Sequence, residues 1–69
     1  MNGWKKNLDN GMVRVYNKYI NGRNRSIQIY LKSKNHDVVL YSNGRITTIK
    51  TFRSKKSALV YAKAYMGKY

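Results

Sequence analysis

Four stretches of the chain are rich in Val, Ile, Tyr and Thr, the residue types that favour β-strands. They cover residues 12–20, 26–32, 37–41 and 45–51. Turn-forming residues separate them, and two of the breaks contain Asn-Gly, at 21–22 and 43–44. Asn and Gly both tolerate the positive φ angles of a type I′ turn, so this pair signals a tight hairpin. The pattern predicts an antiparallel β-meander over 12–51, preceded by a polar N-terminal segment, 1–10.

The C-terminal part has the spacing of a helix. Its apolar residues recur three, four and seven positions apart, at Ala58, Leu59, Ala62, Tyr65 and Met66. The hydroxyl of Ser54 can accept a backbone N–H of the first turn, and Gly67 is a typical stop. We therefore expect a helix over 54–66, packed on one face of the sheet. The predicted class is α+β, a single domain (1–69) with a meander of three to four strands and one C-terminal helix.

Turn geometry predicts which strand residues face this helix. We assume a two-residue turn at 43–44 and a four-residue loop at 33–36. The pairs that follow are Tyr41–Ile46, Leu40–Thr47 and Val38–Ile49 in the last hairpin, and Lys32–Asp37, Leu31–Val38, Tyr30–Val39 and Ile29–Leu40 in the one before it. Both hairpins agree on the residues of the inner face, which are Ile27, Ile29, Leu31, Val38, Leu40 and Ile49.

The first strand does not fit this scheme. Its apolar residues are expected inside and its polar ones outside, which gives Val13 and Val15 facing the helix, and Arg14, Tyr16 and Lys18 facing away. A tight turn at 21–22 would instead place Val15 opposite Gln28, on the outer face. We therefore predict a bulge or a wider loop between the first two strands.

The net charge of the chain is the most informative feature of its composition. The chain of 69 residues has 15 Lys and Arg against two acids, a formal net charge of +13. Such a charge indicates a polyanionic partner, because Lys and Arg release condensed counterions when they contact phosphates. The absence of Cys excludes disulfides and thiolate zinc sites. No apolar run approaches the roughly 20 residues of a membrane span, and no signal-peptide core follows Met1. We expect a cytoplasmic protein without a membrane partner.

The outer face of the predicted sheet combines aromatic rings with cations. This combination suits nucleic acid, because cations contact phosphates while rings stack on bases. Half-exposed Tyr is also an ordinary strand residue, and Arg in a turn can simply be solvated. The candidate binding residues, including two arginines of the first hairpin loop, are Arg14, Tyr16, Lys18, Arg23, Arg25, Tyr30, Lys32, Tyr41 and Lys50.

The sequence gives no basis for catalysis. General acid–base chemistry needs a positioned pair, and the candidates are His36, Asp37 and Asp9. His36 and Asp37 are neighbours at a predicted hairpin tip, where the Asp can pair with a Lys. One His and two distant acids fall short of a two-metal nuclease site. We expect no enzyme, no cofactor and no metal.

The hinge Thr51-Phe52-Arg53-Ser54-Lys55-Lys56-Ser57-Ala58, between a three-stranded sheet and a C-terminal helix, resembles the arm-type DNA-binding domains of phage and transposon tyrosine integrases. Those domains are similar to plant AP2-type domains, and both lay the face of the sheet in the major groove. The likeness covers less than a third of the chain. It concerns DNA binding alone, since no Arg-His-Arg-Tyr recombinase constellation is recognised. It implies DNA contacts by Arg14, Tyr16, Tyr30, Lys32 and Tyr41.

These observations favour a small basic nucleic-acid-binding protein, with duplex DNA ahead of single-stranded DNA or RNA. Stacking tyrosines would suit single strands, whereas a sheet in a groove suits duplex. The rival function is a basic interaction protein that docks on an acidic protein surface, such as a phage-encoded inhibitor of a host enzyme. The abundance of Lys, Asn, Tyr and Ile is typical of AT-rich coding sequence, as in phages and mobile elements. The location would then be the host cytoplasm.

Overall fold

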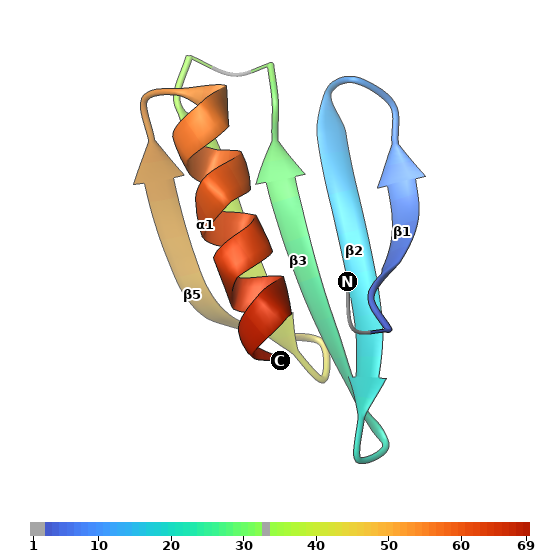
Figure 1. The fold of residues 1–69 in the computed structure, drawn as a ribbon. Helices are drawn as coiled ribbons and strands as arrows, with labels where there is room; N and C mark the ends of the chain where they lie inside the picture. The colour runs from blue at the N-terminus through green and yellow to red at the C-terminus, as the bar shows by residue number, and fades with distance from the viewer. Residues whose placement is uncertain (1–2, 33) are drawn as a thin grey trace.

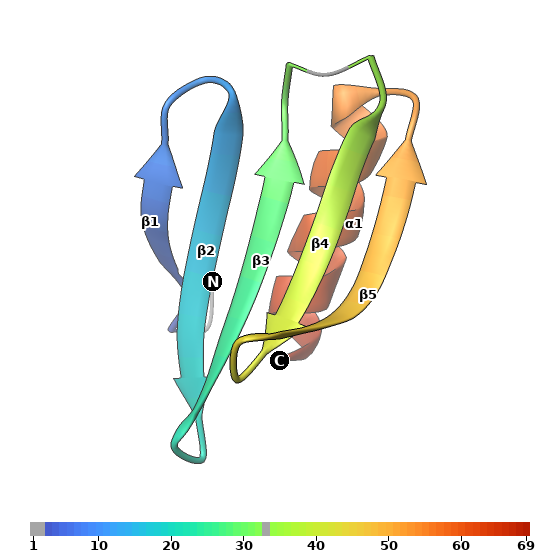
Figure 2. The same cartoon turned by 180° about the vertical axis from the view of Figure 1, so that it is seen from behind.

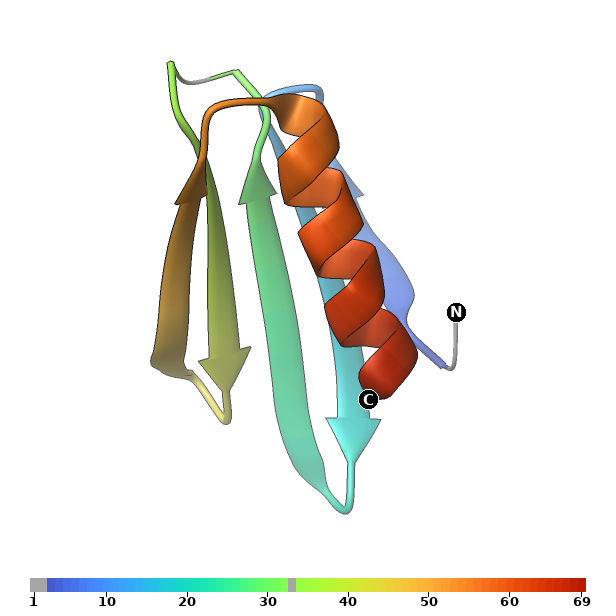
Figure 3. The same cartoon turned by 60° about the vertical axis from the view of Figure 1, so that its left-hand side comes forward.

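The computed structural model describes residues 3–32 and 34–69, which form one open antiparallel sheet and one helix. The elements are β1 (Lys5–Asp9), β2 (Val13–Ile20), β3 (Arg23–Tyr30), β4 (His36–Ser42), β5 (Arg45–Phe52) and α1 (Lys55–Lys68). The strands lie in the order β1-β2-β3-β4-β5, so each strand pairs with its neighbours in sequence. The helix covers one face over β3, β4 and β5 (Figures 1 and 3). The α+β class is confirmed, with one strand more than expected.

The additional strand is β1, which lies in the segment predicted to be merely polar. It pairs with β2 from Lys5 opposite Asn17 to Asp9 opposite Arg14, with a bulge between Lys6 and Leu8. All five of its residues are exposed. An exposed edge strand shows no apolar alternation, and therefore the sequence pattern did not predict it.

The turn between β2 and β3 is tight. Asn21 and Gly22 have φ angles of 52° and 76°, the left-handed values that a type I′ turn requires. The register then runs without interruption and places Val15 opposite Gln28 and Tyr16 opposite Ile27. The predicted bulge or wider loop is therefore wrong.

This register reverses the faces expected for β2. Val13 and Val15 lie on the outer face, away from α1. The side of the sheet that carries α1, called here the helix-side face, receives Tyr16, which is buried in the core. A one-residue change of register moves every side chain of a strand to the other face.

The β3–β4 pair keeps the predicted faces although its register differs. Ile29 lies opposite Val38, and Ile27 opposite Leu40, two positions away from the expected pairs. The loop is longer than predicted because β3 ends at Tyr30 and β4 begins at His36. An even shift preserves which face each residue occupies, so these four residues are buried as predicted.

The β4–β5 hairpin contains a bulge. Asn43 and Gly44 have φ angles of 55° and 83°, and Tyr41 lies opposite Ile46 as expected. The register then shifts, so that Thr48 rather than Thr47 faces Leu40. The Thr47 hydroxyl donates a hydrogen bond to the Leu40 carbonyl oxygen at 3.2 Å.

The bulge moves Ile49 and Lys50 of β5 to the faces opposite to those predicted. Val39 lies opposite Ile49, and Val38 opposite Lys50. Ile49, predicted inside, is therefore on the outer face and 58% exposed. Lys50, predicted outside, lies on the helix-side face, with its Nζ 5.7 Å from the Tyr61 ring centroid.

The helix follows the prediction closely. The Ser54 side chain caps it by accepting a hydrogen bond from the Ser57 backbone N–H at 3.1 Å. Ala58, Ala62 and Met66 are buried against the sheet. The helix does not stop before Gly67 but continues to Lys68. The core cluster consists of Trp4, Tyr16, Ile27, Ile29, Leu31, Val38, Leu40, Ala58, Ala62 and Met66.

Truncation of Leu40 to Ala tests this packing. The side chain is 4% exposed and belongs to the core cluster, so Leu40→Ala should lower the free energy of unfolding by about 2–5 kcal/mol. Val60→Ala, on the exposed side of the helix, should stay within about 0.5 kcal/mol of the native protein. Urea denaturation followed by circular dichroism measures both. Equal effects would contradict the assignment of the core.

Two glycine substitutions test the tight turn between β2 and β3. A Cβ at Gly22 or at Gly67 would meet no atom within 4 Å, so Ala at either position reports on the backbone alone. Gly22→Ala, at positive φ, should destabilise the protein by about 1–2 kcal/mol. Gly67→Ala, within the helix, should stabilise it by up to about 0.5–1 kcal/mol. Thermal unfolding gives both signs, and a stabilising Gly22→Ala would argue against the left-handed turn.

Candidate nucleic-acid interface

The two faces of the sheet differ sharply in charge. Among the described strand residues, every Lys and Arg except Lys5 has the register of the helix-side face. They are Lys6, Arg14, Lys18, Arg23, Arg25, Arg45 and Lys50. The outer face, turned toward the viewer in Figure 2, instead carries apolar residues beside uncharged polar residues and one acid. The apolar residues are Val13, Val15, Tyr30, Val39, Tyr41, Ile46 and Ile49, and the polar ones include Asn17, Asn24, Gln28 and Asp37. The cations therefore share the side of the molecule on which the helix and its lysines lie.

The predicted binding face does not exist as one surface. Tyr30, Lys32 and Tyr41 do lie on the outer side. The other six lie on the helix-side face, namely Arg14, Tyr16, Lys18, Arg23, Arg25 and Lys50. Tyr16 is 7% exposed and belongs to the core, so its ring is not free to stack on a base. The predicted mixture of tyrosines and cations on the outer face is therefore wrong.

Three cations gather around two tyrosines at the C-terminal end of α1. The Arg25 guanidinium donates from Nη1 to the Tyr65 hydroxyl at 3.0 Å, and its Cζ lies 4.6 Å from the Tyr69 ring centroid. Lys68 Nζ lies 5.7 Å from the same centroid. Lys18 donates to the Tyr69 carbonyl oxygen. We call Lys18, Arg25 and Lys68 the cationic cluster.

Aromatic packing holds this cluster in place. The Tyr65 and Tyr69 rings lie 4.9 Å apart, and Trp4 contacts Tyr65 edge-on at 5.9 Å. The cluster thus joins β2, β3 and the last turn of α1, with the segment before β1 packed behind it. Cations stacked on rings keep their charge while losing part of their freedom, so they are partly ordered before any ligand arrives.

Neither acid of the chain neutralises the cluster. Asp9 accepts a hydrogen bond from Arg14 Nε at 3.0 Å and lies 3.6 Å from Lys6 Nζ. Asp37 accepts a hydrogen bond from the Thr51 hydroxyl at 2.7 Å. No acidic side chain therefore offsets the positive charge of the cluster. The C-terminal end of α1 places a partial negative charge beside the cluster. This charge offsets only part of the repulsion among the three cations.

Sequence reasoning found part of this cluster. Lys18 and Arg25 were among the candidates, whereas Lys68, Tyr65 and Tyr69 were not. The helical spacing assigned Tyr65 to packing, and nothing in the sequence indicates that the last turn of the helix returns to β2 and β3.

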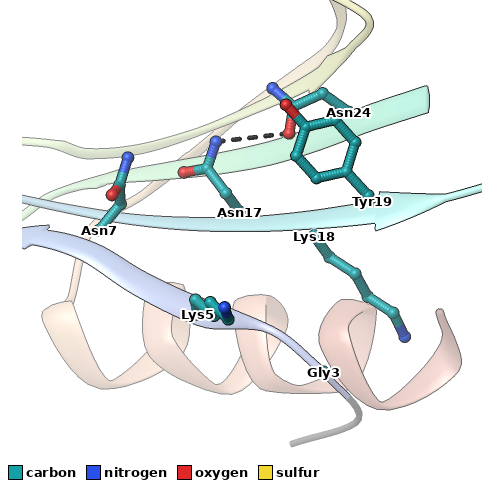
Figure 4. Close-up of a pocket in the computed structure, with 7 residues that line it drawn as sticks. All are labelled: Gly3, Lys5, Asn7, Asn17, Lys18, Tyr19 and Asn24. Carbon is teal, nitrogen blue, oxygen red and sulfur yellow. Dashed lines mark hydrogen bonds between the residues drawn. The ribbon is translucent and has the colours of Figure 1, made fainter. Parts of the chain in front are cut away.

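A shallow polar hollow of about 510 Å³ lies beside the cluster, over β1, β2 and β3 (Figure 4). It is lined by Gly3, Lys5, Asn7, Asn17, Lys18, Tyr19 and Asn24. Asn17 donates from Nδ2 to Asn24 Oδ1 at 3.5 Å, and the Tyr19 ring, 74% exposed, lies next to them. These amides and this ring were not singled out from the sequence. Asn17, Tyr19 and Asn24 belong to the outer face, whereas Lys18 extends from β2 toward the helix (Figure 4).

Within residues 3–32 and 34–69, no group of three or more His, Cys, Asp or Glu side chains could hold a metal ion. The helix found there lacks the length and the apolar composition to cross a membrane.

The pKa of Asp9 is perturbed by its neighbours. Desolvation raises the pKa of Asp9, but the Arg14 guanidinium, the Gly11 backbone N–H and the Lys6 ammonium outweigh it, so this pKa lies below its ordinary value of 3.8. Because the folded-state pKa is lowered, ionised Asp9 stabilises the protein above pH 3.8. That contribution is lost as the pH falls through the folded-state pKa.

The Asp9→Asn variant tests this linkage. Its deficit in unfolding free energy relative to the native protein should shrink as the pH falls below 3.8, measured by urea denaturation at several pH values. Arg14→Gln should raise the pKa of Asp9, measured by NMR titration of the carboxyl carbon. A deficit that is independent of pH would rule out a role for the ionised carboxylate.

No family model, no curated protein and no solved structure matches this chain, so its function is inferred from the surfaces described above.

Proposed function

We propose that this protein binds nucleic acid, with duplex DNA favoured, and that its helix-side face makes the phosphate contacts. The observation that carries the proposal is the cationic cluster, in which Arg25 and Lys68 contact the Tyr69 ring, Lys18 donates to the Tyr69 backbone oxygen, and neither Asp lies beside them. Like charges held together without a counter-charge cost stability. A phosphate backbone relieves that repulsion and releases counterions.

The helix extends this surface. Exposed lysines follow α1 from its first turn to its last, at Lys55, Lys56, Lys63 and Lys68. They lie on the side of the molecule that also holds Lys18 and Arg25, so one extended polyanion can contact both groups. Arg25 uses Nη1 for the Tyr65 hydroxyl, and its other N–H groups can donate to phosphate oxygens.

Duplex DNA is favoured over single strands because the argument for stacking has weakened. Tyr16 is buried, and Tyr30 and Tyr41 lie on the face that is almost without cations. Tyr19 is an exposed ring, but its register places it on the same outer face, opposite to Lys18. Rows of cations with few exposed rings suit regularly spaced phosphates. The resemblance to integrase arm-type domains implied docking by the face of the sheet, and the distribution of charge supports the helix-side face instead.

Binding to a labelled duplex at a series of salt concentrations tests the proposal. The logarithm of the association constant should fall linearly with the logarithm of salt concentration. Lys18→Ala and Arg25→Ala should each weaken binding and flatten the slope by about 0.9, the value for one phosphate contact. Lys32→Ala removes the same charge from the outer side and is the matched control, so it should leave the slope nearly unchanged. Fluorescence anisotropy gives all four curves.

Other results would indicate a different interface or a different function. If Lys32→Ala flattens the slope while Lys18→Ala does not, the interface is the outer face. If duplex is not bound at low salt, the proposal is wrong. Capture of an acidic protein from nuclease-treated lysate, lost on Arg25→Ala, would then support the rival function, because a protein partner survives the nuclease.

A further inference from the structure

The outer face of the sheet carries exposed apolar residues where a solvated face would be polar, beside the polar residues Asn17, Asn24 and Gln28. An antiparallel sheet covered on one side normally alternates apolar residues inside with polar residues outside. Here Ile46 and Ile49 are 55% and 58% exposed, and Val13, Val15 and Tyr41 lie in the same layer. No element of the described chain covers this face (Figure 2).

The bulge in β5 enlarges this surface. Without it, Ile49 would point to the core and Lys50 would point outward, as the turn at Asn43–Gly44 alone predicts. The shifted register instead pairs Ile49 with Val39 on the outer face, next to the Tyr41–Ile46 pair. The result is an apolar patch over β4 and β5. On β3, Gln28 separates Val39 from Val15, and Tyr30 lies opposite Val13.

Charge decides what can cover the patch. Among the described strand residues, the outer side carries one cation, Lys5 on the edge strand β1, and one acid, Asp37 on β4; Lys32 lies beyond the end of β3 on the same side. Phosphates and acidic proteins are attracted to the other side of the molecule. A second copy, repelled by the +13 charge elsewhere, meets little repulsion here.

We propose that the outer face is the interface of a homodimer in which two sheets pack face to face. Strands about 4.8 Å apart and a rise of about 3.4 Å per residue give a five-stranded face on the order of 600 Å² per copy. Two copies would bury about 1,200 Å², the lower end of the range for specific interfaces. Small domains commonly gain stability by oligomerisation, since one small core buries little surface.

This arrangement is independent of nucleic-acid binding. A two-fold axis through the paired sheets directs both helix-side faces outward, on opposite sides of the dimer. The tyrosines of the outer face then belong to the interface and are not available to a ligand.

Sedimentation equilibrium of the full chain, without nucleic acid, tests the dimer. The native protein should sediment at twice its chain mass of 8.1 kDa. Ile49→Lys should raise the dimer dissociation constant at least about tenfold, since it buries an unpaired charge. Val60→Lys adds the same charge at a site on the helix that is 60% exposed, and should leave the dimer intact. Circular dichroism verifies that each variant is folded.

Ile46→Lys provides a second variant in case Ile49→Lys fails to fold, and should dissociate the dimer in the same way. A native protein that stays monomeric at several hundred micromolar would overturn the proposal. So would equal dissociation by Val60→Lys, which would indicate a general effect of charge. A loss of duplex binding by folded, monomeric Ile49→Lys relative to an equally monomeric native protein would assign the outer face to nucleic acid instead.

Discussion

Two Asn–Gly turns, at Asn21–Gly22 and Asn43–Gly44, hold left-handed backbone angles that decide which side chains of the sheet face the helix. The first turn gives an unbroken register and sends Tyr16 into the core. The second turn sets the register of the β4–β5 hairpin as far as Tyr41 and Ile46. The bulge at Thr47 then moves the following residues of β5 to the opposite faces of the sheet. Both the electrostatic asymmetry of the sheet and its apolar outer face follow from these few backbone positions.

Helix and inner face were predictable because their patterns tolerate small errors. At helical spacing, Ala58, Ala62 and Met66 fall on one face of a single helix, and the cap at Ser54 marks the start of that helix. The β3–β4 register differed by two positions, yet Ile29 and Leu40 stayed buried because the strand period is two.

The faces of β2 and β5 were predicted wrongly for a different reason. The rule that apolar residues point inward assigned Val13, Val15 and Ile49 to the core, and all three are on the outer face. A bulge leaves no mark in the sequence, and an exposed edge strand such as β1 has no apolar period. The candidate site was predicted least well, because its residues come from β2, β3 and the end of α1 and are brought together only in the folded chain.

Trp4 makes this architecture observable. It is the chain's single tryptophan, 7% exposed and in edge contact with Tyr65, which in turn accepts a hydrogen bond from Arg25. Its indole Nε1 has no hydrogen-bond partner among the described residues. Emission from an indole in such an apolar setting is blue-shifted, and it moves to the red when water reaches the ring. The protein therefore carries an intrinsic optical probe where the N-terminal segment meets the helix. A red shift that precedes the loss of the circular dichroism signal would mark detachment of that segment, without any attached dye.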